Sequence, residues 1–149
     1  MLRIAAIFMV LASPAAAAQL RPLGDKSLCM DGGTQIQPGI NRVQVAACND
    51  SDGQDVRRGE QNTIYIGALC LQAVSVKGSE KIEIAAMRCH GRDGQRWAMT
   101  RDGRLTSGQK LCLTVTGEPA ARELLMTPCK EASADMTDQK WAIYGKFDR

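Results

Sequence analysis

The chain repeats a set of landmarks three times at intervals of about 41 residues, and this repeat limits the possible folds more than any other feature. Each unit contains an apolar residue, then a cysteine flanked by apolar residues, then a second cysteine, and then a glutamine two residues before another apolar residue. Four landmarks in one order, three times over, indicate three copies of one structural unit. They are Leu23, Cys29, Cys48 and Gln54 in the first unit, Ile64, Cys70, Cys89 and Gln95 in the second, and Leu105, Cys112, Cys129 and Gln139 in the third.

The local patterns inside the units are those of β-strands, because short β-branched or alternating segments are bounded by glycine-containing turns. Arg101-Asp102-Gly103 predicts a hairpin, with the glycine supplying the positive φ. Each unit is expected to hold about four strands, which gives about twelve in the chain. A helix over residues 118–126 is the alternative in the third unit, since helix formers gather there. The clearest predicted strands are 63–66, 69–76, 81–86 and 111–116.

Three equal β-units in one domain predict an all-β fold with pseudo-threefold symmetry. Propellers typically need four or more blades, so a closed threefold barrel of the trefoil type is favoured, and closure also removes most exposed sheet edges. The six cysteines allow fifteen disulfide connectivities, and no CxxC pair suggests a metal site instead. Threefold symmetry leaves two patterns, pairing within each unit or cyclic pairing between units.

The first 18 residues have the layout of a secretory signal peptide: a positive start, an apolar stretch from Ile4 to Ala12, and a run of alanines that predicts cleavage after Ala18. Residues 19–149 are then expected to form one domain, with repeats at roughly 21–60, 61–102 and 103–149. The signal segment predicts export, and six cysteines suit an exported domain because disulfides persist there. We therefore expect a secreted or periplasmic protein. Removal of Arg3 takes the net charge from +3 to +2, which is too small a positive charge to indicate nucleic-acid binding. We also expect no membrane span after the signal segment.

Together these landmarks resemble the ricin-B type lectin family, a β-trefoil whose three units each carry a Leu-Cys-Leu strand, a later cysteine and a Gln-x-Trp motif. The resemblance extends from about Leu23 to Tyr144. It implies three disulfides within units, Cys29 to Cys48, Cys70 to Cys89 and Cys112 to Cys129. We expect the motif residues Gln95, Trp97, Gln139 and Trp141 to be structural, because tryptophan fills a barrel interior and glutamine holds a turn. The first unit departs from the family, since Val56 replaces the tryptophan.

The resemblance also implies where sugars would bind. In the family an acidic residue stands two after the first cysteine, a polar residue four before the second, an aromatic residue two before it, and an asparagine before the motif glutamine. The aromatic position holds Ala46, Met87 and Thr127, so the sugar sites are degenerate. For Asp31, a turn residue bonded to its own backbone is the competing interpretation. The candidate carbohydrate-binding residues are Asp31, Gln44 and Gln54 in the first unit, and Asp138 and Gln139 in the third.

The sequence contains no catalytic constellation, metal-ligand spacing or cofactor motif, so we expect no enzyme, metal or cofactor. His90 in a glycine-rich turn is interpreted as a solvated loop residue. Two hypotheses remain for the partner. The first is a carbohydrate or glycoconjugate bound by an exported, noncatalytic, lectin-like module. The second is a protein partner, bound by a trefoil that has lost its sugar sites and serves as a toxin-delivery or adhesion-type subunit.

Overall fold

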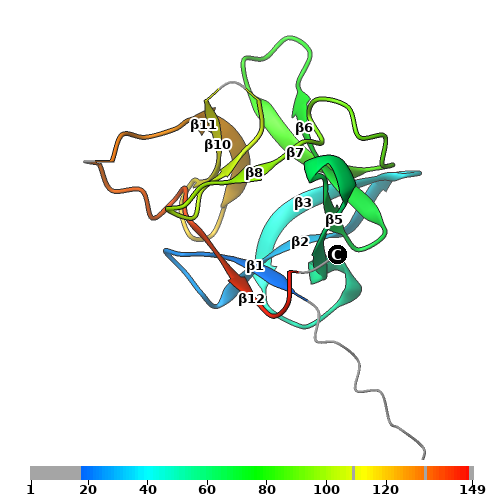
Figure 1. Ribbon diagram of the computed structural model, residues 1–149, viewed down its shortest axis with the longest axis horizontal. Coiled ribbons are helices and arrows are strands. Elements are labelled where there is room, and N and C mark those ends of the chain that lie inside the picture. Colours follow the sequence, from blue (N-terminus) through cyan, green and yellow to red (C-terminus); the bar gives the residue numbers. More distant parts are fainter. Residues whose placement is uncertain (1–17, 109, 133, 148–149) are drawn as a thin grey trace, which may run out of the picture.

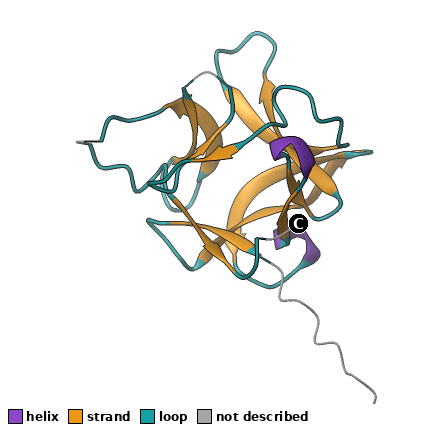
Figure 2. Cartoon of the chain, in the orientation of Figure 1, coloured by secondary structure: helices purple, strands orange, loops and turns teal. Residues whose placement is uncertain are grey.

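The computed structural model describes residues 18–108, 110–132 and 134–147. In this part the chain forms strands, loops and two short 3-10 helices (Figure 2). The predicted signal segment lies outside the described residues except for Ala18. The elements are β1 (Gln19–Pro22), β2 (Leu28–Gln37), β3 (Ile40–Ala47), η1 (Asp52–Gln54), β4 (Val56–Arg58), η2 (Glu60–Asn62), β5 (Ile64–Ile66), β6 (Leu69–Ser75), β7 (Ile82–Met87), β8 (Ala98–Met99), β9 (Leu105–Thr106), β10 (Leu111–Thr116), β11 (Glu123–Pro128) and β12 (Trp141–Tyr144).

Strand pairing follows the threefold repeat. Each unit contributes one long antiparallel hairpin, β2–β3, β6–β7 or β10–β11, and the three hairpins surround a common axis (Figure 1). The last strand of each unit pairs with the first strand of the next, as β4–β5 and β8–β9. The same relation joins β12 to β1, so the two ends of the domain close the fold. This is the predicted β-trefoil, with twelve strands in the described residues.

Each unit is closed by its own disulfide, which is the pairing that the family resemblance implied. The bonds join Cys29 to Cys48, Cys70 to Cys89 and Cys112 to Cys129, and the Cα–Cα distance is 5.0 Å in all three. Each bond closes a loop of 17 or 19 residues. In the chain-entropy model a loop of this size contributes about 3 kcal/mol to the free energy of unfolding.

The apolar core is built from positions that are equivalent in the three units. The residue after each first cysteine is completely buried, and the residue five before each second cysteine is 5% exposed. In the second strand of each hairpin the core residue follows an exposed charged residue, Arg42, Glu83 or Glu123, as expected for strands with one buried face. The two sets are Met30, Leu71 and Leu113, and Val43, Ile84 and Leu124.

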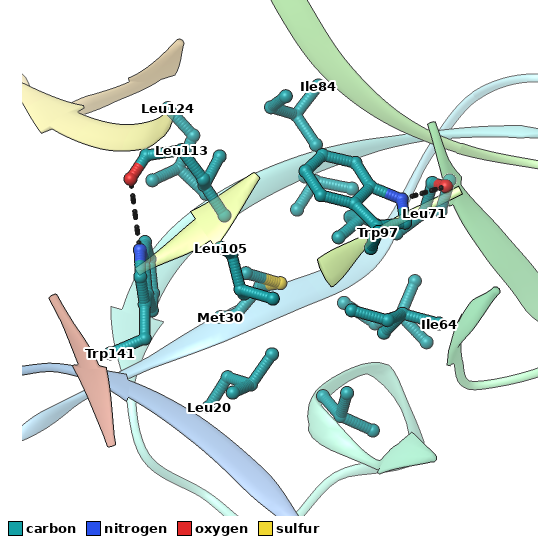
Figure 3. Close-up of a cluster of buried hydrophobic side chains, with 14 of the residues drawn as sticks. Leu20, Met30, Ile64, Leu71, Ile84, Trp97, Leu105, Leu113, Leu124 and Trp141 are labelled. Carbon is teal, nitrogen blue, oxygen red and sulfur yellow. Dashed lines mark hydrogen bonds between the residues drawn. The ribbon is translucent and has the colours of Figure 1, made fainter. Parts of the chain in front are cut away.

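The two tryptophans of the Gln-x-Trp motifs lie inside this core at 4% exposure. The indole Nε1 of Trp97 donates to the carbonyl of Leu71 at 2.9 Å, and that of Trp141 donates to the carbonyl of Leu113 at 3.1 Å (Figure 3). Each indole therefore ties the last strand of its unit to the Leu-Cys-Leu strand of the same unit, and neither ring presents a face to solvent.

The first unit is packed differently. Val56 replaces the tryptophan and is completely buried, with its N–H donating to the carbonyl of Ala18 at 2.8 Å. Leu23, the apolar residue at the landmark position of this unit, is 39% exposed, and Leu20 fills the core. The cause is a longer turn between β1 and β2, which shifts the buried residue three positions upstream. The helix that was the alternative for residues 118–126 does not form, because β11 begins at Glu123 and pairs along its length with β10.

Candidate functional site

The motif glutamines organise each unit around its disulfide. Gln54, for example, is completely buried, and its amide is bonded at both ends. Its Nε2 donates to the Asp31 carboxylate at 3.0 Å and to the Ala47 carbonyl at 2.9 Å, while its Oε1 accepts the N–H of Asn49 at 2.9 Å. The two backbone groups flank Cys48, so one side chain fixes both the second cysteine and the acidic position of the unit.

The second and third units repeat this arrangement. Gln95 bonds the Arg88 carbonyl, the His90 N–H and the side chain of Gln72. Gln139 bonds the Pro128 carbonyl, the Lys130 N–H and the hydroxyl of Thr114. All three glutamines are completely buried. The expectation that Gln54 and Gln139 contact a sugar directly therefore needs correction: their amides hold the neighbouring side chain and the disulfide, because no surface of either residue reaches solvent.

Asp31 is held in place and still partly exposed. Its Oδ1 accepts the N–H of Gly33 at 2.8 Å, which is the predicted turn, and its Oδ2 accepts from Gln54. A carboxylate oxygen has two lone pairs, so each oxygen retains one for a further donor. Gln44 stands directly opposite Asp31 in the β2–β3 ladder, and paired residues of this kind project from the same face of the sheet. The structure thus brings Asp31, Gln44 and Gln54 together.

The loop beside Asp31 has no room for the asparagine that the family has before the motif glutamine. At the position before the motif glutamine, where the family has asparagine, stands Gly53. A Cβ added there would lie 2.7 Å from the Cα of Gly33 and 3.1 Å from the carboxylate of Asp31. Contacts this short are forbidden, so glycine is required for the two backbone segments to approach.

The candidate residues of the third unit form a separate group. Asp138 makes an ion pair with Lys130 at 2.8 Å, which neutralises its charge. Thr114, at the position of Asp31, is 3% exposed and shares a 2.6 Å hydrogen bond with Thr127. The third unit therefore offers neither an open carboxylate nor an open hydroxyl at the position where the first unit has Asp31.

Asp138 also borders a cavity of about 180 Å³ that contains an ion pair between Asp25 and Arg122 at 2.9 Å. Hydrogen bonds from the Ser27 hydroxyl and from Arg122 lower the pKa of Asp25 from 3.8 to about 2. Asp25 is therefore ionised at neutral pH and compensates the guanidinium charge, and it connects the β1–β2 turn to the start of β11.

Sequence reasoning missed a polar pair in the second unit. His90 is an exposed loop residue, as expected, and its Nε2 lies 3.1 Å from the Oε1 of Gln72. Its Nδ1 accepts the N–H of Arg92 at 3.1 Å, so the neutral ring carries its proton on Nε2 and donates it to Gln72. The signal was available in the sequence, because Gln72 stands two after the first cysteine, as Asp31 does.

Within residues 18–108, 110–132 and 134–147, no group of three or more His, Cys, Asp or Glu side chains is arranged to hold a metal ion. The same residues include no helix long and apolar enough to cross a membrane.

Comparisons with known proteins agree with this geometry. The family model described as the ricin-type β-trefoil lectin domain matches residues 16–141. A comparison with curated protein sequences found no match.

Solved structures share the fold at low sequence identity. The β-trefoil lectin of the Vibrio vulnificus hemolysin/cytolysin, solved with N-acetyl-D-lactosamine bound, is 19% identical with a TM-score of 0.68, and the match covers 90% of this chain and 97% of that one. The mdaA-1 domain is 12% identical with a TM-score of 0.70, covering 95% and 97%. A non-toxic homologue of type II RIPs from Momordica charantia (bitter gourd), in complex with α-methyl-D-galactoside, is 17% identical with a TM-score of 0.68, covering 87% and 48%.

Proposed function

The chain belongs to the ricin-type β-trefoil lectin family, and on that premise we propose that it is an exported, noncatalytic module that binds carbohydrate at its first unit, where Asp31 and Gln44 face the ligand. The second and third units are degenerate in this proposal. The ligand is a glycan chain, such as a cell-surface polysaccharide, and not a free monosaccharide.

The observation that supports the proposal is the orientation and partial exposure of the Asp31 carboxylate. It is the carboxylate at the family's acidic position, it is oriented by Gln54 and Gly33, and it is partly exposed beside Gln44. A carboxylate and an amide on one face can accept from and donate to adjacent sugar hydroxyls, and a ligand acceptor that is already oriented loses little entropy on binding. The family's aromatic position holds Ala46 in this unit, so ring stacking of about 1–3 kcal/mol is missing, which disfavours tight binding of a single sugar.

Export and the lack of catalysis are parts of the same proposal. Three disulfides support an oxidising compartment, because such bonds persist outside the cytosol. Within the described candidate site, each polar side chain has a role as an acceptor, a donor or a positioning group, and no nucleophile is paired with a base.

The test is a glycan array probed with the oxidised protein, its Asp31→Asn variant and its Asp138→Asn variant. We expect the wild type to bind a set of glycans, Asp31→Asn to lose them, and Asp138→Asn to keep them. Urea unfolding of each variant separates lost binding from lost folding. A wild-type array with no signal would refute the proposal. If the same protein then retained a partner that free sugar could not elute, the second hypothesis, a protein-binding trefoil, would replace it.

A further inference from the structure

The second strands of the three hairpins, β3, β7 and β11, meet about the pseudo-threefold axis. At the first seam β3 pairs with β7, with Arg42 opposite Ala85. At the second seam β7 pairs with β11, with Glu83 opposite Leu125. The two seams are equivalent, because Arg42 and Glu83 both stand six residues before a second cysteine, and Ala85 and Leu125 both stand four before one.

Threefold symmetry therefore requires a third seam in which Glu123 of β11 stands opposite Gln44 of β3. In the described part of the chain no ladder joins these two strands. A cavity of about 430 Å³ lies at this position and is lined by residues of β3, β7 and β11, and by Ala121 and Arg122 just before β11. Arg122 is already paired with Asp25. The axis of the domain is thus closed on two sides and open on the third.

The width of the open seam decides what can enter it. Cα atoms of β3 and β11 approach within 8 Å of each other. Neighbouring strands lie about 4.7–4.9 Å apart, so an inserted peptide strand would require its two neighbours to be about 9.5 Å apart. The seam is therefore too narrow for an added strand, which leaves smaller ligands as its candidate occupants.

The lining is polar and rich in uncommitted groups. Arg42 and Glu83 are exposed on the cavity wall, and neither forms an ion pair with another described residue. Glu123 makes one weak pair with Lys81, at 3.6 Å, and both of these side chains are more than half exposed. The amide of Gln44 forms no side-chain hydrogen bond within the described residues. Carboxylate, guanidinium and amide together match the donors and acceptors of a polyhydroxylated ligand.

The cavity adjoins the candidate site at Gln44, which lines the cavity and stands opposite Asp31 in the β2–β3 ladder. We propose that the open seam between β3 and β11 is a second saccharide subsite, in which Arg42, Glu83 and Glu123 bind the hydroxyls of the sugar next to the one at Asp31. This inference rests on the proposed function. It makes the ligand an oligosaccharide of at least two sugars that runs from Asp31 across Gln44 to the pseudo-threefold axis.

The experiment compares disaccharides with their component monosaccharides. Lactose, N-acetyl-D-lactosamine, cellobiose and chitobiose, together with glucose, galactose and N-acetylglucosamine, are titrated into 15N-labelled oxidised protein, and Kd values are taken from the amide shifts. We expect at least one disaccharide to bind about tenfold more tightly than its component sugars, because one or two additional hydrogen bonds correspond to that factor. Its titration should shift the amides of Gln44, Glu123 and Leu125.

Three variants locate the second sugar. Glu83→Gln and Arg42→Gln should each raise the Kd of the disaccharide several-fold toward that of the monosaccharide and leave monosaccharide binding unchanged. Glu80→Gln, the same change in the exposed β6–β7 connection, is the matched control and should alter neither.

The outcomes separate the two proposals. Equal affinity for disaccharides and monosaccharides, with shifts confined to the surroundings of Asp31, would overturn the seam subsite and leave the proposed function standing. No response to any saccharide, here and on the array, would overturn both.

Discussion

The most direct test of how the fold builds its site is the substitution Gln54→Leu. The change removes two neutral hydrogen bonds, to Ala47 and from Asn49, and one bond to the charged carboxylate of Asp31. Net values of about 1 kcal/mol for each neutral bond and about 2 kcal/mol for the charged one give a loss of about 4 kcal/mol. The leucine side chain is apolar in a completely buried position, which returns about 1 kcal/mol. The free energy of unfolding should therefore fall by about 3 kcal/mol.

The assay is equilibrium unfolding of the oxidised protein in urea, followed by the fluorescence of the two buried tryptophans. With an m-value of about 2 kcal/mol per molar, the midpoint should move down by about 1.5 M. The matched control is Gln44→Leu, the same chemical change at a partly exposed position without a side-chain hydrogen bond in the described residues, where we expect less than about 0.5 kcal/mol. If the two variants lost equal stability, or if Gln54→Leu lost less than about 1 kcal/mol, the clamp described above would not be a principal support of the first unit.

A double-mutant cycle isolates the bond that matters for function. Asp31→Ala and Gln54→Leu are measured alone and together, and the coupling between them should be about 1–2 kcal/mol, since both groups share one hydrogen bond to a charged acceptor. Additive effects would show that Gln54 supports the disulfide turn without orienting the carboxylate.

Three further predictions concern Val56, Asp25 and Gly53. A chain that begins at Gln19 should be less stable in urea than one that begins at Ala18 by about 1–3 kcal/mol, because it leaves the buried N–H of Val56 without its acceptor; equal midpoints would contradict this. The pKa of Asp25 is lowered to about 2, so its contribution to stability is present above its ordinary pKa of 3.8 and is lost as the pH falls toward 2; Asp25→Asn should flatten the acid limb of stability against pH, and an unchanged limb would refute the ion pair. Replacing Gly53 by the family's asparagine should cost about 1–3 kcal/mol and fail to strengthen glycan binding, because its Cβ would collide with Gly33; a gain in array signal would show that the loop can move aside.

The part of the fold that the sequence predicts is the part written into repeated spacings. The cysteines and the motif glutamines recur at intervals of 40 to 44 residues, and a β-unit that cannot bury its apolar face alone must pack against its copies. The hairpin at Arg101-Asp102-Gly103 was likewise predictable, since Gly103 has the positive φ that the turn requires. These signals depend on local backbone geometry and on counting residues.

The features that spacing did not show depend on how distant segments pack against each other. Counting back from the first cysteine selected Leu23, and only the β1–β12 register places Leu20 in the core. Gln54 and Gln139 were candidates for contact with sugar, while Gln95 and Gln139 were also expected to hold a turn. Their complete burial depends on how the segments flanking the second cysteine fold over them, and spacing along the chain does not contain that information.

The open seam between β3 and β11 could not be predicted from spacing along the chain either. It bears on the question of how a site without a stacking aromatic residue could bind sugar. A site without its aromatic residue lacks about 1–3 kcal/mol of stacking, which weakens the binding of a single sugar by about one to two orders of magnitude. In the proposed subsite, one or two hydrogen bonds from Arg42, Glu83 or Glu123 to a second sugar would supply about 1 kcal/mol each and recover much of that loss. The recovery is available to an oligosaccharide alone, because a single sugar at Asp31 does not extend to the axis. If both proposals hold, the missing aromatic residue and the open seam would together make the site of the first unit selective for glycan chains over single sugars.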